Sequence, residues 1–163
     1  MLRSAAANGI LVSVLGEEFT QAYETSDKKL SKVLAMRTLL NSKNHRKTHN
    51  IVDNTILVFT DATDVVYVGE KENFEVLFSI LEEEHGFGTI FVGAEENCWP
   101  YMLGNTERIK DGRRTCEKLS SLSNSKYRYL NSGTYIGRAQ HLVQFYDELL
   151  KHLKVEEDRG KRA

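Results

Sequence analysis

The chain lacks long apolar runs, carries almost no excess of charge, and contains only two cysteines and one proline. No apolar run approaches the roughly 18 residues that a transmembrane helix needs, so we expect no membrane span. Its 22 basic and 23 acidic residues give a net charge of -1, which argues against a nucleic-acid or anionic-membrane partner recruited by bulk electrostatics. Cys98 and Cys116 do not have the spacing of zinc ligands. The sequence also contains no low-complexity tract or internal repeat.

The length and the N-terminal residues indicate one domain without a visible targeting segment. With 163 residues, of which 40% are hydrophobic, the chain can bury one ordinary core, and we expect a single domain over residues 1–163. Arg3 and the apolar residues after it superficially suggest a signal peptide. Asn8-Gly9 interrupts that apolar region, so the pattern instead predicts the end of a helix, a turn at Asn8-Gly9 and a strand over Ile10–Leu15.

Two aspartates follow a short, fully apolar run. Ile56–Phe59 predicts a strand buried on both faces, as in a parallel sheet flanked by helices. Ligands of such sheets bind at the carboxyl ends of the strands, where Asp61 and Asp64 lie. Two carboxylates across a turn can bring their oxygens to one point, and Mg²⁺ or Mn²⁺ prefers oxygen ligands. The pair predicts a metal-diphosphate site; alternatively, either aspartate caps the following segment or shapes the turn.

The flanking apolar patterns predict an α/β fold. Helical spacing predicts two helices, Ser26–Leu40 and Lys71–Glu84, and the apolar face of the second consists of Phe74, Leu77, Phe78 and Leu81. The polar, basic segment Asn41–Asn54 predicts a solvated loop. Gly86 and Gly88 end the second helix before an apolar strand over Thr89–Val92. A strand, a helix and a strand of these lengths form a βαβ unit, which implies a parallel sheet with right-handed crossovers.

A carboxylate and the only tryptophan follow the second of these strands. Glu95 and Trp99 lie after its carboxyl end, at the edge of the sheet that Asp61 and Asp64 are expected to occupy. An aromatic ring offers apolar contact to a sugar, while a carboxylate accepts hydrogen bonds from its hydroxyls, so the pair indicates sugar recognition. The alternative is that Trp99 anchors the core or a lid.

The C-terminal third predicts a loop, a short strand and a helix. Tyr101–Lys126 has no clear period and predicts a long loop that can include a helical turn. Such loops serve as lids or acceptor-binding elements, and the alternative is a disordered segment. Asn131-Ser132-Gly133 predicts a tight turn into a short strand, Thr134–Ile136. Apolar residues from Leu142 to Leu153 predict a final amphipathic helix, and residues 155–163 a frayed tail.

Three segments resemble, in the same order, segments of a known family. They are Thr60-Asp61-Ala62-Thr63-Asp64-Val65-Val66, Ala94-Glu95 with Cys98-Trp99-Pro100, and Leu130-Asn131-Ser132-Gly133 with Ile136-Gly137. They resemble the Asp-x-x-Asp-Val-Val, Ala-Glu…Cys-Trp-Pro and Leu-Asn-Ser-Gly-x-x-Ile-Gly segments of the glycosyltransferase domain in the procollagen-lysine hydroxylase and glycosyltransferase (PLOD-type) family. The resemblance runs from about Leu2 to about Lys154, so it covers nearly all of the chain.

The resemblance implies a fold and a set of cofactors. The fold is α/β, of the nucleotide-diphospho-sugar transferase type (GT-A-like and Rossmann-like), with a mixed sheet flanked by helices, and residues 1–16 hold its second-strand region. The cofactors are a UDP-sugar donor and Mn²⁺ or Mg²⁺, with Asp61 and Asp64 as metal ligands. Lys28, Asp61, Thr63 and Asp64 are the implied donor-binding residues. Lys28 lies in the first turn of a predicted helix, which favours phosphate; alternatively it is a solvated surface lysine.

The resemblance also implies a reaction and a location. The reaction transfers a hexose, such as galactose, to a hydroxyl acceptor, which in the family is a collagen-type hydroxylysine, and Glu95, Trp99 and Asn131 are the implied catalytic residues. Family members work in the secretory pathway, in the endoplasmic reticulum lumen. A disulfide between Cys98 and Cys116 would form there and stabilise the loop by about 3 kcal/mol. The alternative is two independent thiols.

Parts of the family pattern have no counterpart in this chain. The first strand, the acidic Asp-Asp-Gln run and the distant histidine that completes the metal ligation are not matched, so we expect an incomplete domain, truncated at both ends. The sequence therefore does not decide between an active hexosyltransferase and a catalytically incomplete fragment or degenerate binding domain. Phosphoryl transfer with Asp61 as the nucleophile is a third, weaker hypothesis. An uncovered sheet edge near Ile10–Leu15 and Ile56–Phe59 further predicts a chain that is marginally stable or aggregates.

Overall fold

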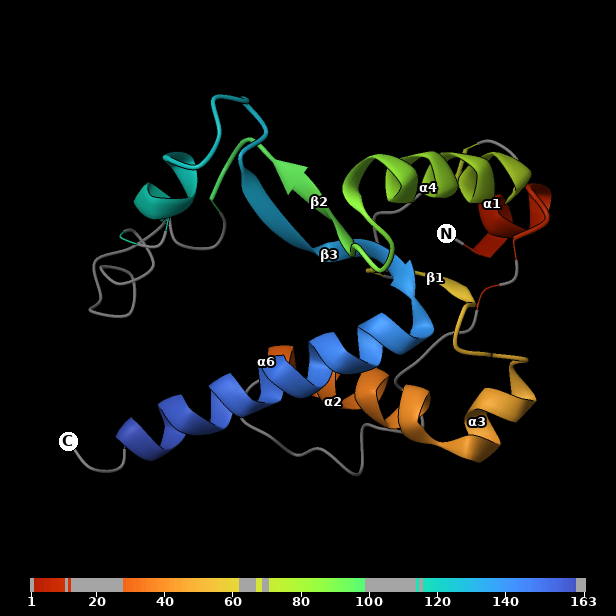
Figure 1. Ribbon diagram of the computed structural model, residues 1–163, viewed down its shortest axis with the longest axis horizontal. Helices are drawn as coiled ribbons and strands as arrows, with labels where there is room; N and C mark the ends of the chain where they lie inside the picture. The colour runs from red at the N-terminus through yellow and green to blue at the C-terminus, as the bar shows by residue number, and fades with distance from the viewer. Residues whose placement is uncertain are drawn as a thin grey trace. The chain divides into compact units, whose positions relative to one another are not determined.

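The computed structural model describes residues 2–10, 12, 28–61, 67–68, 71–98, 114 and 116–160. In chain order its elements are α1 (Leu2–Ala7), α2 (Lys28–Asn41), α3 (Lys43–Thr48), β1 (Ile56–Thr60), α4 (Lys71–His85), β2 (Phe91–Glu95), β3 (Tyr129–Arg138) and α6 (Ala139–Gly160) (Figure 1). Residues 116–120 are also helical. The chain divides into two compact units: unit 1 is Met1–Leu57, Ala62–Ile90 and Gly137–Ala163, and unit 2 is Val58–Asp61 and Phe91–Ile136. That residues 1–163 form a single partial glycosyltransferase-like domain stays a prediction.

The described strands form a three-stranded sheet in the order β1-β3-β2. β2 and β3 are antiparallel. The Ala139 amide donates to the Thr55 carbonyl, and the Asp61 amide donates to the Gly133 carbonyl, so β3 also runs antiparallel to β1. β1 and β2 therefore run in the same direction, as the predicted βαβ unit requires, but they are not paired with each other, and the described pairings are antiparallel rather than parallel. β3, which comes much later in the chain, lies between them.

The bounds and burial of the strands also differ from the prediction. β1 is half-buried and its Val58 is exposed, rather than buried on both faces, because β1 lies at the edge of the described sheet. The second strand is Phe91–Glu95 rather than Thr89–Val92. Ile10 and Val12, the described members of the predicted strand Ile10–Leu15, belong to no strand, and the rest of that range lies outside the described residues.

β3 contains an irregularity opposite the middle of β2. Val92 pairs with Tyr135, and the next residue of β2, Gly93, pairs with Asn131, so Ser132, Gly133 and Thr134 are extra residues on β3. Asn131-Ser132-Gly133, predicted as a tight turn before a short strand, is instead a bulge inside a ten-residue strand. Bulges bend a strand and redirect its side chains, so this segment still changes direction locally.

The helices of unit 1 agree better with the apolar periodicity. α2 packs against α6, and the buried side chains there include Met36, Leu39 and Leu40 on α2 and Leu142 and Tyr146 on α6. The turn at Asn8-Gly9 is confirmed, with Gly9 at a φ of 65° that suits glycine.

Two segments that were predicted as irregular are helical. α3 lies within the predicted loop Asn41–Asn54, and it begins after Ser42, whose hydroxyl accepts from the His45 amide at 3.4 Å as an N-cap. α6 runs to Gly160, so residues 155–160, predicted as part of a frayed tail, are helical. A local cap and continuing helix formers extend both helices although neither segment is apolar.

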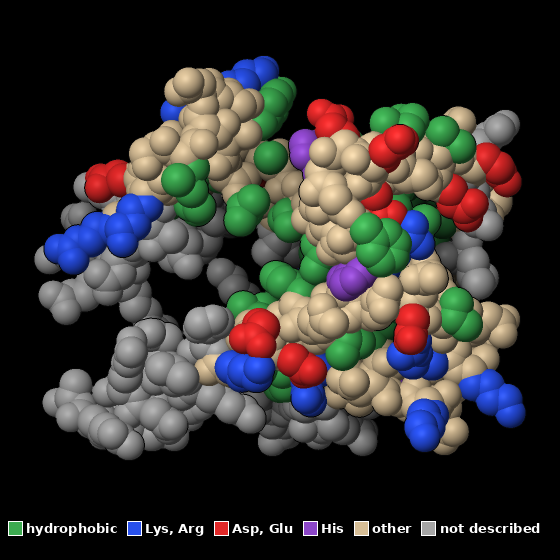
Figure 2. Space-filling model, viewed as in Figure 1, with side chains coloured by type: hydrophobic (Ala, Val, Ile, Leu, Met, Phe, Trp, Pro, Cys, Tyr) green, Lys and Arg blue, Asp and Glu red, His purple; other side chains and the backbone are tan. Residues whose placement is uncertain are grey.

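α4 has nearly the predicted bounds, but it buries a different face. Phe78 is 1% exposed, whereas Phe74, Leu77 and Leu81 are exposed. Figure 2 shows apolar side chains beside acidic ones on the surface of α4. Gly86 and Gly88 have φ values of 102° and 88° and end the helix as predicted. None of the described helices has the length and apolar content that a membrane crossing requires.

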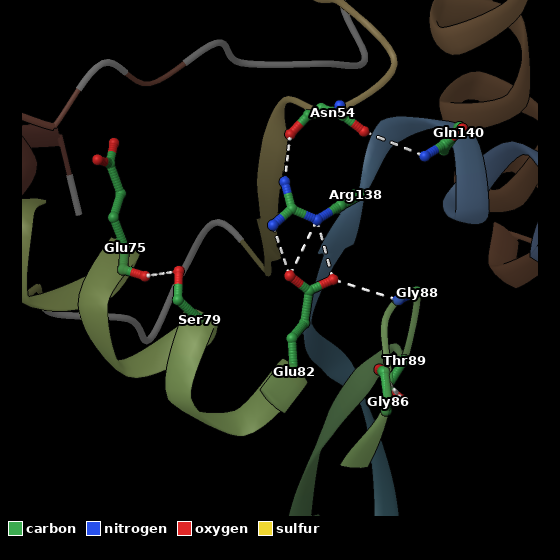
Figure 3. A network of polar contacts seen from close by, with 9 residues as sticks. All are labelled: Asn54, Glu75, Ser79, Glu82, Gly86, Gly88, Thr89, Arg138 and Gln140. Carbon is green, nitrogen blue, oxygen red and sulfur yellow. Dashed lines mark hydrogen bonds and ion pairs between the residues drawn. The ribbon is translucent and has the colours of Figure 1, made fainter. Parts of the chain in front are cut away.

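A buried ion pair joins α4 to the end of β3 in unit 1 (Figure 3). Glu82 is 6% exposed, and the Arg138 side chain is 17% exposed. Arg138 Nε donates to both Glu82 carboxylate oxygens at 2.9 Å, Nη2 donates to Oε2 at 2.5 Å, and Nη1 donates to the Asn54 carbonyl at 2.9 Å. The Gly88 amide donates to Glu82 Oε1 at 3.2 Å. A buried carboxylate this well partnered acts as a structural clamp between the elements of unit 1.

Candidate functional site

Asp61 lies directly after β1, at the carboxyl end of the strand as predicted. Its backbone amide donates to the Gly133 carbonyl of the β3 bulge at 2.7 Å, and the residue is half-buried. The sheet therefore holds the backbone of Asp61 at the position where the strand ends.

Asn131 begins the bulge of β3. Its side-chain Oδ1 accepts from the Gly133 amide at 2.7 Å, an Asx-type contact that fixes the orientation of the side-chain amide. The oxygen has a second lone pair beyond this hydrogen bond. Asn131 therefore presents a fixed, half-buried oxygen at the bulge.

Gly133 is the point at which these two side chains meet. A Cβ atom on Gly133 would lie 2.8 Å from Asp61 Oδ2 and 2.9 Å from Asn131 Oδ1. Both oxygens thus lie close to one point, the Cβ position of residue 133. This point is open only because residue 133 is a glycine. From the sequence, Gly133 was expected in a turn and in one of the segments that resemble the family, with no role at the site. The signal that marks it is a glycine two residues after a motif asparagine.

Glu95, the last residue of β2, lies close to Asn131 in the sheet. It pairs with Tyr129, and Gly93 pairs with Asn131. Alternate residues of a strand share a face, so Glu95 projects from the same face as Gly93. A Cβ atom on Gly93 would lie 3.6 Å from Asn131 Cβ, which places Asn131 on this face too. Asn131 and the half-buried Glu95 are therefore diagonal neighbours on one face of unit 2.

The other predicted site residues lie at or beyond the limits of the described residues. Lys28 is the first residue of α2, which agrees with its predicted place in a first helical turn, but its side chain is not among those described. Thr63, Asp64 and Trp99 lie outside the described residues. The structure thus brings Asp61 and Asn131 together beside Gly133, makes Glu95 a diagonal neighbour of Asn131, and leaves the remaining assignments as predictions.

The chemistry of the described donors suits a divalent cation. A carboxylate oxygen and an amide oxygen are the hard ligands that Mg²⁺ and Mn²⁺ prefer, and Asp61 and Asn131 supply one of each near a single point. Within the described ranges, no group of three His, Cys, Asp or Glu side chains could by itself hold a metal ion. The predicted partner ligand Asp64 is not part of those ranges.

A disulfide lies just beyond the last residue of β2. Cys98 and Cys116 are bonded and both are buried, so the alternative of two independent thiols is wrong. Their Cα atoms are 5.8 Å apart. The bond ties the segment after Glu95 to the helical residues 116–120.

The comparisons with known proteins agree with the sequence motifs. No curated protein and no solved structure matches the chain. A family model described as the PLOD GT domain matches residues 1–159, which is nearly the entire sequence. The match includes all of the residues discussed above as site candidates. The chain therefore belongs to the PLOD glycosyltransferase domain family.

Proposed function

We propose that this chain forms a metal-dependent glycosyltransferase domain that transfers a hexose from a UDP-sugar to a hydroxyl acceptor. Membership of the PLOD glycosyltransferase domain family supports the reaction class. The observation that carries the proposal is the approach of Asp61 Oδ2 and Asn131 Oδ1 to one point beside Gly133, at the carboxyl end of β1. Ligands of α/β sheets bind at such strand ends.

Within this proposal, each residue has a definite role. Asp61 and Asp64 hold Mn²⁺ or Mg²⁺, and the bound ion supplies neutralisation of charge on the departing diphosphate. Lys28 and Thr63 bind the diphosphate group, for which the first turn of α2 is electrostatically favourable. Asn131 and Glu95 orient the hexose by hydrogen bonds to its hydroxyls, and Trp99 offers its ring to the apolar side of the sugar.

The proposed acceptor is a hydroxylated peptide of the collagen type, in the lumen of the secretory pathway. The acceptor follows from the family, whose members modify hydroxylysine. The location is supported by the disulfide between Cys98 and Cys116, because structural disulfides persist in oxidising compartments and are rare in the cytosol.

The proposal is tested by measuring release of UDP from UDP-glucose and UDP-galactose, with and without Mn²⁺ and a hydroxylysine peptide. We expect Mn²⁺-dependent turnover that the Asp61→Ala/Asp64→Ala variant lacks. A matched control is Asp53→Ala, which removes an exposed carboxylate of unit 1 that pairs with Arg46. No turnover above the double variant, in a preparation with a cooperative melt, would refute the enzymatic proposal.

The same experiment also tests the alternative that the chain is a binding domain without catalysis. If calorimetry detects Mn²⁺-dependent UDP binding but no UDP is released from any donor, the chain is a nucleotide-sugar binding domain. If neither binding nor turnover occurs, both functions are excluded for this chain.

A further inference from the structure

We infer that Gly133 is a positioning residue that determines where the side-chain oxygens of Asp61 and Asn131 lie. Its amide donates to Asn131 Oδ1 at 2.7 Å, and its carbonyl accepts from the Asp61 amide at 2.7 Å. The place of its missing side chain lies 2.8 Å from Asp61 Oδ2. Gly133 thus meets Asp61 and Asn131 through its amide, its carbonyl and the space beside its Cα atom. The inference rests on the proposed function, because it assigns Gly133 to the same metal and donor site.

Space, rather than backbone conformation, is the reason for a glycine here. Gly9, Gly86 and Gly88 have positive φ values, which side chains rarely tolerate. Gly133 is not in that region, so an alanine could adopt its backbone angles. The methyl group of an alanine would, however, lie 2.8 Å from Asp61 Oδ2 and 2.9 Å from Asn131 Oδ1. At such distances the methyl group or the oxygens must move.

Neither oxygen can withdraw without changing the site. Asp61 Cγ lies 3.2 Å from the added Cβ position, so the whole carboxylate would have to rotate, not only one oxygen. Asn131 Oδ1 is held by the hydrogen bond from the Gly133 amide, which a rotation of the side chain would break. A methyl group on Gly133 therefore displaces the proposed metal ligand Asp61 and the proposed hexose-binding Asn131, while it leaves their chemical identity unchanged.

Gly93, on β2 opposite the bulge of β3, provides a matched control. A Cβ atom there would lie 3.3 Å from the Thr134 carbonyl, 3.4 Å from Thr134 Cβ and 3.6 Å from Asn131 Cβ. These contacts are tight or ordinary, and none involves Asp61. Gly93→Ala thus adds the same methyl group to the same irregular segment without touching the Asp61 carboxylate.

The first test measures Mn²⁺ affinity of the full chain by the paramagnetic signal of the free ion. We expect Gly133→Ala to weaken Mn²⁺ binding on the order of 10–100-fold, the usual cost of disturbing groups that orient metal ligands. Gly93→Ala should bind Mn²⁺ nearly as tightly as the unsubstituted chain. Metal-free UDP affinity should change little in either variant, which a general loss of structure would not allow.

The outcomes of this test separate the inference from the proposed function. If the unsubstituted chain binds no Mn²⁺, the proposed function fails. If it binds Mn²⁺ and Gly133→Ala binds equally well, the inference about Gly133 is overturned and the proposed function stands. Equal losses in Gly133→Ala and Gly93→Ala would also overturn the inference, because the bulge as a whole would then be responsible.

The second test measures the contact without any metal or activity. A double-mutant cycle on urea denaturation compares Gly133→Ala in the unsubstituted chain and in the Asp61→Ala background, where the carboxylate is gone. We expect the midpoint to fall clearly in the first case and much less in the second. If Gly133→Ala does not fold, the Asp61→Ala/Gly133→Ala chain should fold again. If neither chain folds, or if the two midpoint shifts are equal, the Asp61 carboxylate is not the reason that residue 133 has to be glycine.

Discussion

Two carboxylates, one in each unit of this molecule, have different described contacts. Glu82, in unit 1, is buried against a guanidinium and a backbone amide and receives hydrogen bonds from Arg138 and Gly88. Asp61, in unit 2, is half-buried, and its carboxylate approaches the same point as the amide oxygen of Asn131. A carboxylate held by a guanidinium and a backbone amide is suited to holding a fold, and a carboxylate oxygen and an amide oxygen near one point are two of the hard ligands that a divalent cation prefers.

The same contrast separates residues that matter for stability from residues that matter for binding. Natural proteins often accept a local cost in stability at a binding site, and that cost is offset by contacts elsewhere. The clamp of Glu82 and Arg138 is such a contact. Four predictions follow this comparison, in order of their expected effect on the free energy of unfolding.

Arg138→Met should cause the largest loss of stability. It leaves the Glu82 carboxylate buried without its partner, which typically costs about 3–5 kcal/mol. The control is Arg37→Met, which breaks an ion pair with Asp147 whose side chains are 46% and 38% exposed and should cost about 0.2–1 kcal/mol. Urea denaturation measures both. Equal effects of the two substitutions would contradict the structural role of the Glu82–Arg138 pair.

Removing the disulfide should destabilise unit 2 almost as strongly. Cys98→Ala/Cys116→Ala releases a closed loop whose ends are 18 residues apart, and chain entropy gives about 3 kcal/mol for a loop of this size. The measurement is urea denaturation of the double variant, compared with the oxidised chain. A loss below about 1 kcal/mol would mean that the unfolded chain is already compact around this loop.

Acidification should weaken the clamp in unit 1. Hydrogen bonds from Arg138 lower the pKa of Glu82 below its ordinary value of 4.5; burial opposes this shift, and the hydrogen bond from the Gly88 amide adds to it. The same contact with Glu82 raises the pKa of Arg138 above its ordinary value. Because the folded-state pKa of Glu82 lies below the unfolded one, this stability is complete above about pH 4.5 and is lost as the pH falls through the folded-state pKa. Arg138 stays charged throughout this range.

The acid effect is measured as the urea midpoint from neutral pH down through 4.5. Glu82→Gln cannot titrate at this position, so its midpoint should fall less steeply with acid than that of the unsubstituted chain. Parallel curves for the two chains would show that other carboxylates dominate the acid response.

Asp61→Asn should have the smallest effect on stability and a large effect on binding. It preserves the shape of the side chain and its backbone bond to Gly133, so we expect a change of less than about 1 kcal/mol in either direction. Mn²⁺ affinity should fall by at least on the order of 10–100-fold, because a proposed ligand loses its charge. Calorimetric titration and thermal denaturation test the two parts. A loss of stability comparable with that of Arg138→Met would make Asp61 a structural residue instead.

The local features of this protein were largely predictable from its sequence. The period of Leu30, Val33, Leu34, Leu39 and Leu40 predicted α2, and two glycines predicted the end of α4. The motifs predicted the family correctly. The apolar period did not predict which face of α4 is buried: Phe78 is buried, but Leu77 and Leu81 are exposed. Glu82 occupies part of the buried face because Arg138, a residue far away in sequence, supplies its charge partner.

What the sequence by itself determined is therefore the two helices α2 and α4, the strand that Asp61 follows and the identity of the chemical groups near its end. Tertiary structure alone decided that β3 lies between β1 and β2, and that its bulge carries Asn131 and Gly133 to Asp61. The physical reason is the range of the interactions. Capping, turn geometry and helical period act over a few residues, whereas strand pairing joins segments separated by long stretches of chain and leaves only a weak local signal in either partner.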